Sequence, residues 1–218
     1  MRLLAISLAR VSVFTDIYEW NPQNKISFDE FCKAFVERYR FLKSPQALED
    51  YDLQKGVIFG AGKINTISID TVTLFMKGIV IDTRSSTIDA EHFLTDATDW
   101  AEEFFGVEHS RDRLGRKVFL SELSFYSEAL FGLLNPKFQH IATKLGEVVT
   151  HYAREPQTFA LFGLSFHVDP PTRLGALNLR IERLAGNPFW ENKYFSSAPL
   201  PTDEHLSLLA EFESILKT

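Results

Sequence analysis

The pattern of hydrophobic and polar residues repeats once along the chain. Residues 56–105 predict a group of short strands followed by an amphipathic helix, and residues 163–216 predict a fainter copy of the same order. Both predicted helices begin with Glu-His and an apolar residue, at 91–93 and 204–206. Each half reads strand, helix, two or three antiparallel strands, helix. We therefore predict an α+β fold of two pseudo-repeated halves, with two antiparallel sheets or one continuous sheet and helices packed on one face.

The first half is predicted to span residues 1–110, beginning with a strand or bent strand pair at 2–20. Apolar residues at helical spacing predict a helix over 27–40, and Ser27 and Glu30 have the spacing of a capping box. Cys32 lies on the apolar stripe of this helix, so we expect a small buried side chain rather than a reactive thiol.

The glycines at 56–62 invite comparison with a phosphate-binding loop. Gly56 and Gly62 are separated by five residues rather than four, and Ile64 follows Lys63 where that loop needs Ser or Thr. We instead predict a hairpin turn at residues 60–63. Alternating residues at 66–74 predict a strand with one wet face, and residues 79–81 predict its antiparallel return.

The helix that follows is unusually acidic. Thr87 or Asp89 is expected to cap it. Its predicted buried face consists of Ile88, Phe93, Leu94, Ala97, Trp100, Ala101, Phe104 and Phe105. Between residues 85 and 110 there are seven acids and no Lys or Arg. This face is interpreted as a solvated surface, a docking surface for a basic partner or a divalent-cation site, with Asp96, Asp99, Glu102 and Glu103 as candidate interaction residues.

Residues 111–117 form a basic segment, which we interpret as a linker between the halves. Its cations are Arg111, Arg113, Arg116 and Lys117. We interpret the three arginines as able to fold back on the acidic helix. All four cations are also the candidate residues for phosphate or nucleic-acid binding.

The second half, residues 118–218, begins with a strand at 118–126, although both halves are also compatible with one continuous domain. Asn135 and Pro136 predict a helix start. The apolar stripe of that helix is Phe138, Ile141, Ala142, Leu145, Val148, Val149 and Tyr152. Residues 159–168 predict a buried strand, and Thr202 is expected to cap a last helix. The apolar residues of this helix are Leu206, Leu209, Phe212, Ile215 and Leu216.

Composition is that of an ordinary globular protein, with 45% hydrophobic and 24% charged residues. The 20 phenylalanines are in excess, which predicts a well-filled core with aromatic area left for an interface, including Phe189 and Trp190. The net charge of −6 disfavours generic nucleic-acid binding. The single cysteine fits a reducing compartment, and no apolar stretch is long enough to span a bilayer, so we expect a cytoplasmic protein without a membrane partner.

Candidate chemistry is sparse. His167 and Asp169 share one face of a strand, as two metal ligands would, but no third ligand lies nearby in the sequence. His92 and His205 stand at equivalent helix starts, where we expect capping or packing roles. No nucleophile motif, paired-cysteine motif or zinc motif is present, so no catalytic residue and no cofactor is expected.

The leading hypothesis is therefore a cytoplasmic, non-catalytic interaction or assembly protein that forms a homo- or hetero-complex. One alternative is a small-ligand-binding protein or unfamiliar hydrolase with a Phe-lined pocket, using His167, Asp169, Arg180 and Glu182. A second alternative is a nucleic-acid accessory protein that docks through the basic segment at 111–117.

Overall fold

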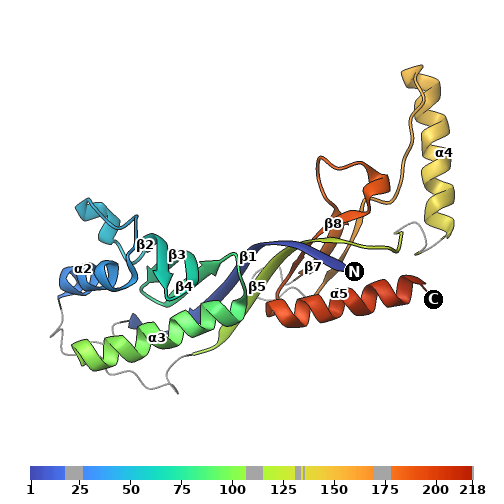
Figure 1. The fold of residues 1–218 in the computed structure, drawn as a ribbon. Coiled ribbons are helices and arrows are strands. Elements are labelled where there is room, and N and C mark those ends of the chain that lie inside the picture. The colour runs from blue at the N-terminus through green and yellow to red at the C-terminus, as the bar shows by residue number, and fades with distance from the viewer. Residues whose placement is uncertain (18–26, 107–114, 131–133, 135, 169–177, 218) are drawn as a thin grey trace. The chain divides into compact units, whose positions relative to one another are not determined.

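The structure of the protein is a computed structural model that describes residues 1–17, 27–106, 115–130, 134, 136–168 and 178–217. Figure 1 shows the fold of these residues. The strands are β1 (Arg2–Phe14), β2 (Val57–Ile64), β3 (Ile67–Phe75), β4 (Gly78–Thr83), β5 (Lys117–Tyr126), β6 (Gly163–His167), β7 (Asn178–Arg183) and β8 (Lys193–Ala198). The helices are α2 (Phe28–Tyr39), α3 (Thr87–Phe105), α4 (Pro136–Ala153), α5 (Thr202–Lys217) and two 3₁₀ helices, η1 (Leu48–Tyr51) and η4 (Phe189–Glu191).

The eight described strands form one open antiparallel sheet in the order β2-β3-β4-β1-β5-β8-β7-β6. The predicted α+β class is therefore confirmed. The order strand, helix, three strands, helix occurs twice along the described chain. The internal repeat itself is not confirmed and stays a prediction.

Residue contacts divide the chain into two compact units. The first unit comprises residues 6–121 and 199–203, and the second comprises residues 1–5, 122–198 and 204–218. Strands β1 and β5 contribute residues to both units. The predicted boundaries at 110 and 118 stay a prediction.

An aromatic cluster forms the core of the first unit, around Phe35 of α2. The Phe35 ring centroid lies 5.0 Å from that of Phe59 on β2, 5.1 Å from Tyr39 and 5.3 Å from Phe41. Cys32 is also buried in this core, as expected, and burial raises the pKa of its thiol to about 12. Much of the phenylalanine excess is thus used for packing.

Two local predictions in the first unit are wrong. Ser27 precedes α2 but makes no side-chain capping hydrogen bond, so the capping box is not formed. The predicted turn at 60–63 lies inside strand β2, and the hairpin closes after Ile64, which pairs with Ile67.

The glycines of β2 allow the segment at 41–43 to approach this strand closely. A Cβ at Gly62 would lie 2.2 Å from the Phe41 ring, so only glycine leaves room for that ring. Gly60 exchanges two backbone hydrogen bonds with Lys43, with N–O distances of 2.9 and 3.0 Å. The segment at 42–43 thereby covers the outer edge of β2, where a free strand edge would otherwise stand open.

The residue that caps helix α3 differs from the two predicted ones. The cap is Ser86, whose Oγ accepts from the Asp89 backbone N–H at 3.0 Å, rather than the predicted Thr87 or Asp89. Most of the predicted apolar face is buried or partly buried. Ile88 and Phe104 depart from the prediction, since they are 59% and 67% exposed.

Thr87 and Thr202, the first residues of α3 and α5, bind each other. The Thr87 backbone N–H donates to Thr202 Oγ1 at 3.0 Å, and the Thr202 N–H donates to Thr87 Oγ1 at 2.9 Å. Each threonine thus satisfies a helix N-terminal donor of the other element, which replaces the capping role predicted for Thr202.

Polar residues fill part of the buried face of α5 in the second unit. His205 and Glu213 are buried on the same face as Leu209 and Leu216, whereas the predicted Ile215 is 63% exposed. Burial alone would raise the pKa of Glu213. Hydrogen bonds from the Met1 ammonium group, the Ser127 hydroxyl and the Glu128 backbone outweigh burial and lower this pKa to about 2.

Candidate functional site

The acidic helix α3 is partly neutralised by residues from other elements. Arg38 of α2 donates to both carboxylate oxygens of Asp96, at 3.1 and 3.2 Å. Lys117, the first residue of β5, forms an ion pair with Glu91 at 2.7 Å. The expectation that the arginines of the basic segment fold back on the acidic helix stays a prediction, since the pair with Glu91 is made by Lys117. The contribution of Arg38 was not foreseen from the sequence.

Three acids in the second half of α3 are exposed to solvent. Asp99, Glu102 and Glu103 are exposed, whereas Asp96 is half-buried and bound to Arg38 and Tyr39. The four candidate interaction residues therefore separate into one structural residue and three surface residues.

The basic segment is only partly visible. Arg111 and Arg113 lie outside the described residues. The Arg116 carbonyl oxygen accepts from the Phe14 backbone N–H at 3.1 Å, so the end of the segment lies against β1. No arrangement of cations for nucleic acid can be assembled from Arg116 and Lys117 alone, and this role stays a prediction.

The metal candidate has one described member. His167 is exposed, and its Nε2 lies 2.8 Å from Ser165 Oγ, while Asp169 lies outside the described residues. No group of three or more His, Cys, Asp or Glu side chains within the described residues has the geometry to hold a metal ion.

The aromatic pair at 189–190 divides between packing and exposure. Arg183 donates a hydrogen bond to the Phe189 carbonyl oxygen at 2.7 Å, and its guanidinium lies 5.1 Å from the centroid of the Phe189 ring. Trp190 is 80% exposed. Phe189 is itself 41% exposed, so both members of the pair reach the surface and Trp190 is the more exposed one.

Three polar residues of the predicted ligand pocket, His167, Arg180 and Glu182, share one face of the paired strands β6 and β7, and Asp169 lies outside the described residues. Arg180 and Glu182 form an ion pair with each other at 3.4 Å on β7. Strand β6, predicted as buried, has no buried residue, and Phe166 on it is 58% exposed. The ligand-binding alternative stays a prediction for these residues.

His92 and His205 lie in different environments. His92 is exposed, whereas His205 is fully buried with Nε2 2.8 Å from Ser196 Oγ. The Ser196 hydroxyl donates to the Arg180 carbonyl oxygen at 2.9 Å, which leaves Nε2 as the donor toward Ser196. Burial lowers the pKa of His205 to about 4, so this neutral imidazole has a packing role, as expected.

Helix α4 carries the largest departure from the sequence prediction. Its predicted apolar stripe is exposed instead of buried, and in the described part of the helix only Gly146 is buried. The five large apolar side chains are 44% to 80% exposed; we call Phe138, Ile141, Leu145, Val148 and Tyr152 the α4 stripe. The predicted N-cap Asn135 lies outside the described residues. The sequence contained the signal for this stripe but not the information that, among the described residues, the stripe stays exposed.

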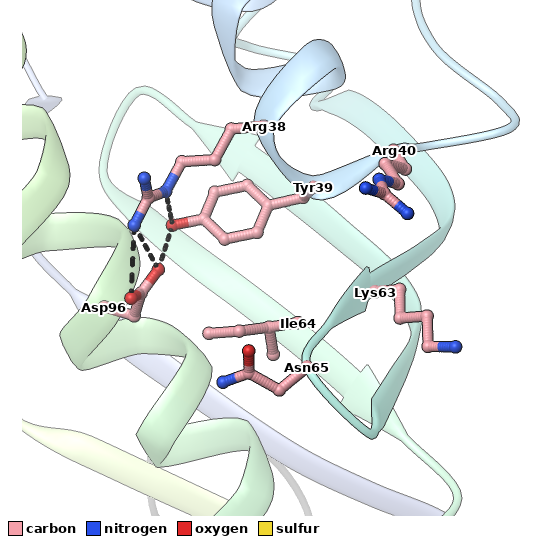
Figure 2. Close-up of a pocket in the computed structure, with 7 residues that line it drawn as sticks. All are labelled: Arg38, Tyr39, Arg40, Lys63, Ile64, Asn65 and Asp96. Carbon is pink, nitrogen blue, oxygen red and sulfur yellow. Dashed lines mark hydrogen bonds and ion pairs between the residues drawn. The ribbon is translucent and has the colours of Figure 1, made fainter.

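A polar cavity of about 380 Å³ lies beside the end of α2 in the first unit. Figure 2 shows Arg38 and Tyr39 at one wall, where both bind Asp96 of α3. The opposite side is formed by the end of β2 and the following turn, with Lys63, Ile64 and Asn65, and Arg40 lies above them.

The wall of this cavity is held in place by a three-residue network. The Tyr39 hydroxyl donates to Asp96 Oδ2 at 2.6 Å and accepts from Arg38 Nε at 3.1 Å. Burial and the bond to Asp96 both raise the pKa of the Tyr39 hydroxyl, so it stays protonated. Arg38 also lies 5.4 Å from the ring centroid of Trp100, which restricts its side chain further.

Searches of the chain against protein-family models and against curated proteins found no match. None of the helices in the described residues combines the length and the apolar character that crossing a membrane requires.

Proposed function

We propose that the protein is a non-catalytic interaction protein that assembles with another protein through helix α4. The observation that carries this proposal is the α4 stripe, in which five large apolar side chains on one helix are 44% to 80% exposed. A contiguous apolar face of this kind on a folded protein is typical of an interaction site.

The spacing of the stripe favours a helical partner. Phe138, Ile141, Leu145, Val148 and Tyr152 follow one another at intervals of three and four residues. These are the a and d positions of a heptad repeat, where side chains of one helix pack into holes formed by another. The 18 residues of α4 extend for about 27 Å, enough for two heptads.

The opposite side of α4 is already occupied by the chain itself. The Gln157 backbone N–H donates to Thr150 Oγ1 at 2.9 Å, and a Cβ at Gly146 would lie 2.7 Å from the Gln157 carbonyl oxygen. At about 100° per residue, Gly146 and Thr150 lie roughly opposite the stripe. The returning chain thus supports the back of the helix and leaves its apolar side open.

The residues beside the stripe define the chemistry of the partner. One flank, at heptad position g, carries Lys137, Lys144 and His151, and the other, at position e, carries Ala142 and Val149. A second copy of α4 paired antiparallel would place cationic flanks against each other. An amphipathic helix from another protein, with carboxylates beside its apolar face, complements this arrangement and is the partner we propose.

Docking would remove apolar area from water at all five stripe positions, and this gross gain is offset in part by the free-energy cost of association. Fully burying one large apolar side chain contributes about 1.5–3 kcal/mol, and roughly half of that remains to be gained at each stripe position, or about 5 kcal/mol in total. Charge pairs along the Lys flank would mainly select the partner and its orientation.

The test uses the full chain and two synthetic helical peptides with leucines at a and d. One peptide carries Glu at the flanking positions and the other carries Lys. We expect the Glu peptide to bind more tightly in fluorescence anisotropy, to lose binding with Leu145→Asn, and to retain it with Thr143→Asn on the opposite side. Equal binding of both peptides, or equal loss in both variants, would contradict the proposed partner.

Native mass spectrometry of the protein purified from its host then reports the assembly itself. A hetero-complex that is lost with Leu145→Asn and kept with Thr143→Asn supports the proposal. A homo-oligomer lost in the same variant would replace the partner helix by a second copy, and a monomer in both proteins would refute assembly through α4. The cytoplasmic location and the absence of catalysis remain part of the proposal, and they rest on the sequence.

A further inference from the structure

The polar cavity of the first unit is cationic in a protein whose net charge is −6. Among its lining residues, the charge of Arg38 is offset by Asp96 in an ion pair at 3.1 Å. Arg40 and Lys63 have no ion pair or side-chain hydrogen bond to any other residue in the described part of the chain. Two positive charges are therefore left over at this cavity.

The cavity also has suitable size and donors for a small ligand. Its volume of about 380 Å³ falls in the range of small-molecule sites, which is roughly 300–1,000 Å³. The amide group of Asn65 adds hydrogen-bonding capacity at the turn after β2, and the buried Ile64 contributes an apolar surface. Figure 2 shows Arg40 and Lys63 on the same side of the cavity, with the Lys63 side chain directed away from Asp96.

The backbone fixes two of these residues in place. Arg40 and Asn65 both have a left-handed conformation, with φ of 53° and 49°. At Arg40 this conformation ends α2, with the backbone N–H of Arg40 bound to the Val36 carbonyl oxygen. The backbone positions of Arg40 and Asn65 at the cavity are therefore defined, although the Arg40 side chain is long enough to adjust to a ligand.

We propose that this cavity binds a small molecule carrying a compact oxyanion, either a phosphate or a carboxylate group. Arg40 supplies a planar pair of N–H donors, which matches both groups, and Lys63 supplies a mobile positive charge that closes over the ligand. The Arg38–Tyr39–Asp96 network forms the rigid wall. Its carboxylate is occupied by two donors, which reduces its repulsion of an anion.

The test is a titration of the full chain, labelled with ¹⁵N, with inorganic phosphate and separately with acetate. Concentrations up to about 20 mM at constant ionic strength detect dissociation constants in the millimolar range. We expect saturable shifts confined to backbone amides near residues 38–41 and 63–66. The more tightly bound of the two anions identifies which oxyanion the site prefers.

The matched variants are Arg40→Gln/Lys63→Gln and, as a control of equal charge, Lys33→Gln/Lys55→Gln. Both control lysines are more than 70% exposed and paired with acids three or four positions away in the sequence, Lys33 with Asp29 and Lys55 with Asp52. Loss of one charge-assisted hydrogen bond weakens binding about tenfold or more, so the first variant should no longer saturate and the control should bind as the unaltered protein does. No saturable shift with either anion, or equal weakening in both variants, would refute the site.

Discussion

Buried His205 makes the second unit sensitive to mild acid. Its imidazole is fully buried against Ser196, and burial lowers its pKa from the ordinary 6.5 to about 4. Between these values the unfolded chain binds a proton that the folded protein does not bind. The free energy of unfolding must therefore fall as the pH is lowered from 6.5 toward 4.

The size of the effect follows from the two pKa values. Each pKa unit corresponds to about 1.4 kcal/mol, so the difference between 6.5 and about 4 is worth about 3 kcal/mol when fully developed. Between about pH 7 and about pH 5, the expected loss is about 2 kcal/mol. This range lies above the pH at which Glu213 begins to titrate.

The assay is equilibrium urea unfolding of the full chain at these two pH values, for the unaltered protein and for His205→Gln. The amide of Gln can donate to Ser196 but does not titrate, so the variant should lack about 2 kcal/mol of the pH dependence. Histidine NMR resonances give the pKa directly. A pKa near 6.5 for His205, or the same pH dependence in both proteins, would refute the reasoning.

Three further substitutions test the packing of the fold by urea unfolding. Gly62→Ala should destabilise the protein by about 1–3 kcal/mol, because its Cβ would meet the buried Phe41 ring at 2.2 Å, and a loss under 0.5 kcal/mol would contradict this. Tyr39→Phe should cost about 1–2 kcal/mol, because Asp96 loses a hydrogen bond of 2.6 Å, and an unchanged urea midpoint would show that Arg38 suffices. The lowered pKa of Glu213 means that the unaltered protein should lose stability as the pH falls from about 4.5 to about 2, because the unfolded chain binds a proton there first. Glu213→Gln does not titrate and should lack this loss. A variant with the same acid transition would exclude this role.

The sequence predicted the positions of the helices and strands better than it predicted their contacts with other segments. Helix α2, predicted over 27–40, spans Phe28–Tyr39, and the hairpin strands and acidic helix lie where periodicity placed them. Periodicity depends on neighbours within one element, and each element carries that information itself. The predicted turn at 60–63 failed because the conformation there is set by Phe41 and Lys43, which lie on another segment.

The candidate sites depend even more on contacts between distant segments, which the sequence pattern does not reveal. The acids of α3 could be recognised from the sequence, but the partner of Asp96 is Arg38, 58 positions away. No local pattern connects two such residues, because their proximity arises only when α2 and α3 pack on the same core. Arg40, Lys63 and Asn65 likewise meet at one cavity only through the pairing of α2 with β2.

The helical conformation of α4 needs a source of stability beyond its own sequence. Helices shorter than about 12–15 residues are marginal in water, and most helical stability in proteins comes from packing an apolar face. The 18 residues of α4 include Gly146 and the β-branched pair Val148 and Val149, which have low helix propensity. Among the described residues, the exposed α4 stripe and the supporting segment at 157–159 provide little of the packing that α3 and α5 obtain from buried residues. A partner helix on the α4 stripe, as proposed, would supply the packing that the described contacts of α4 do not.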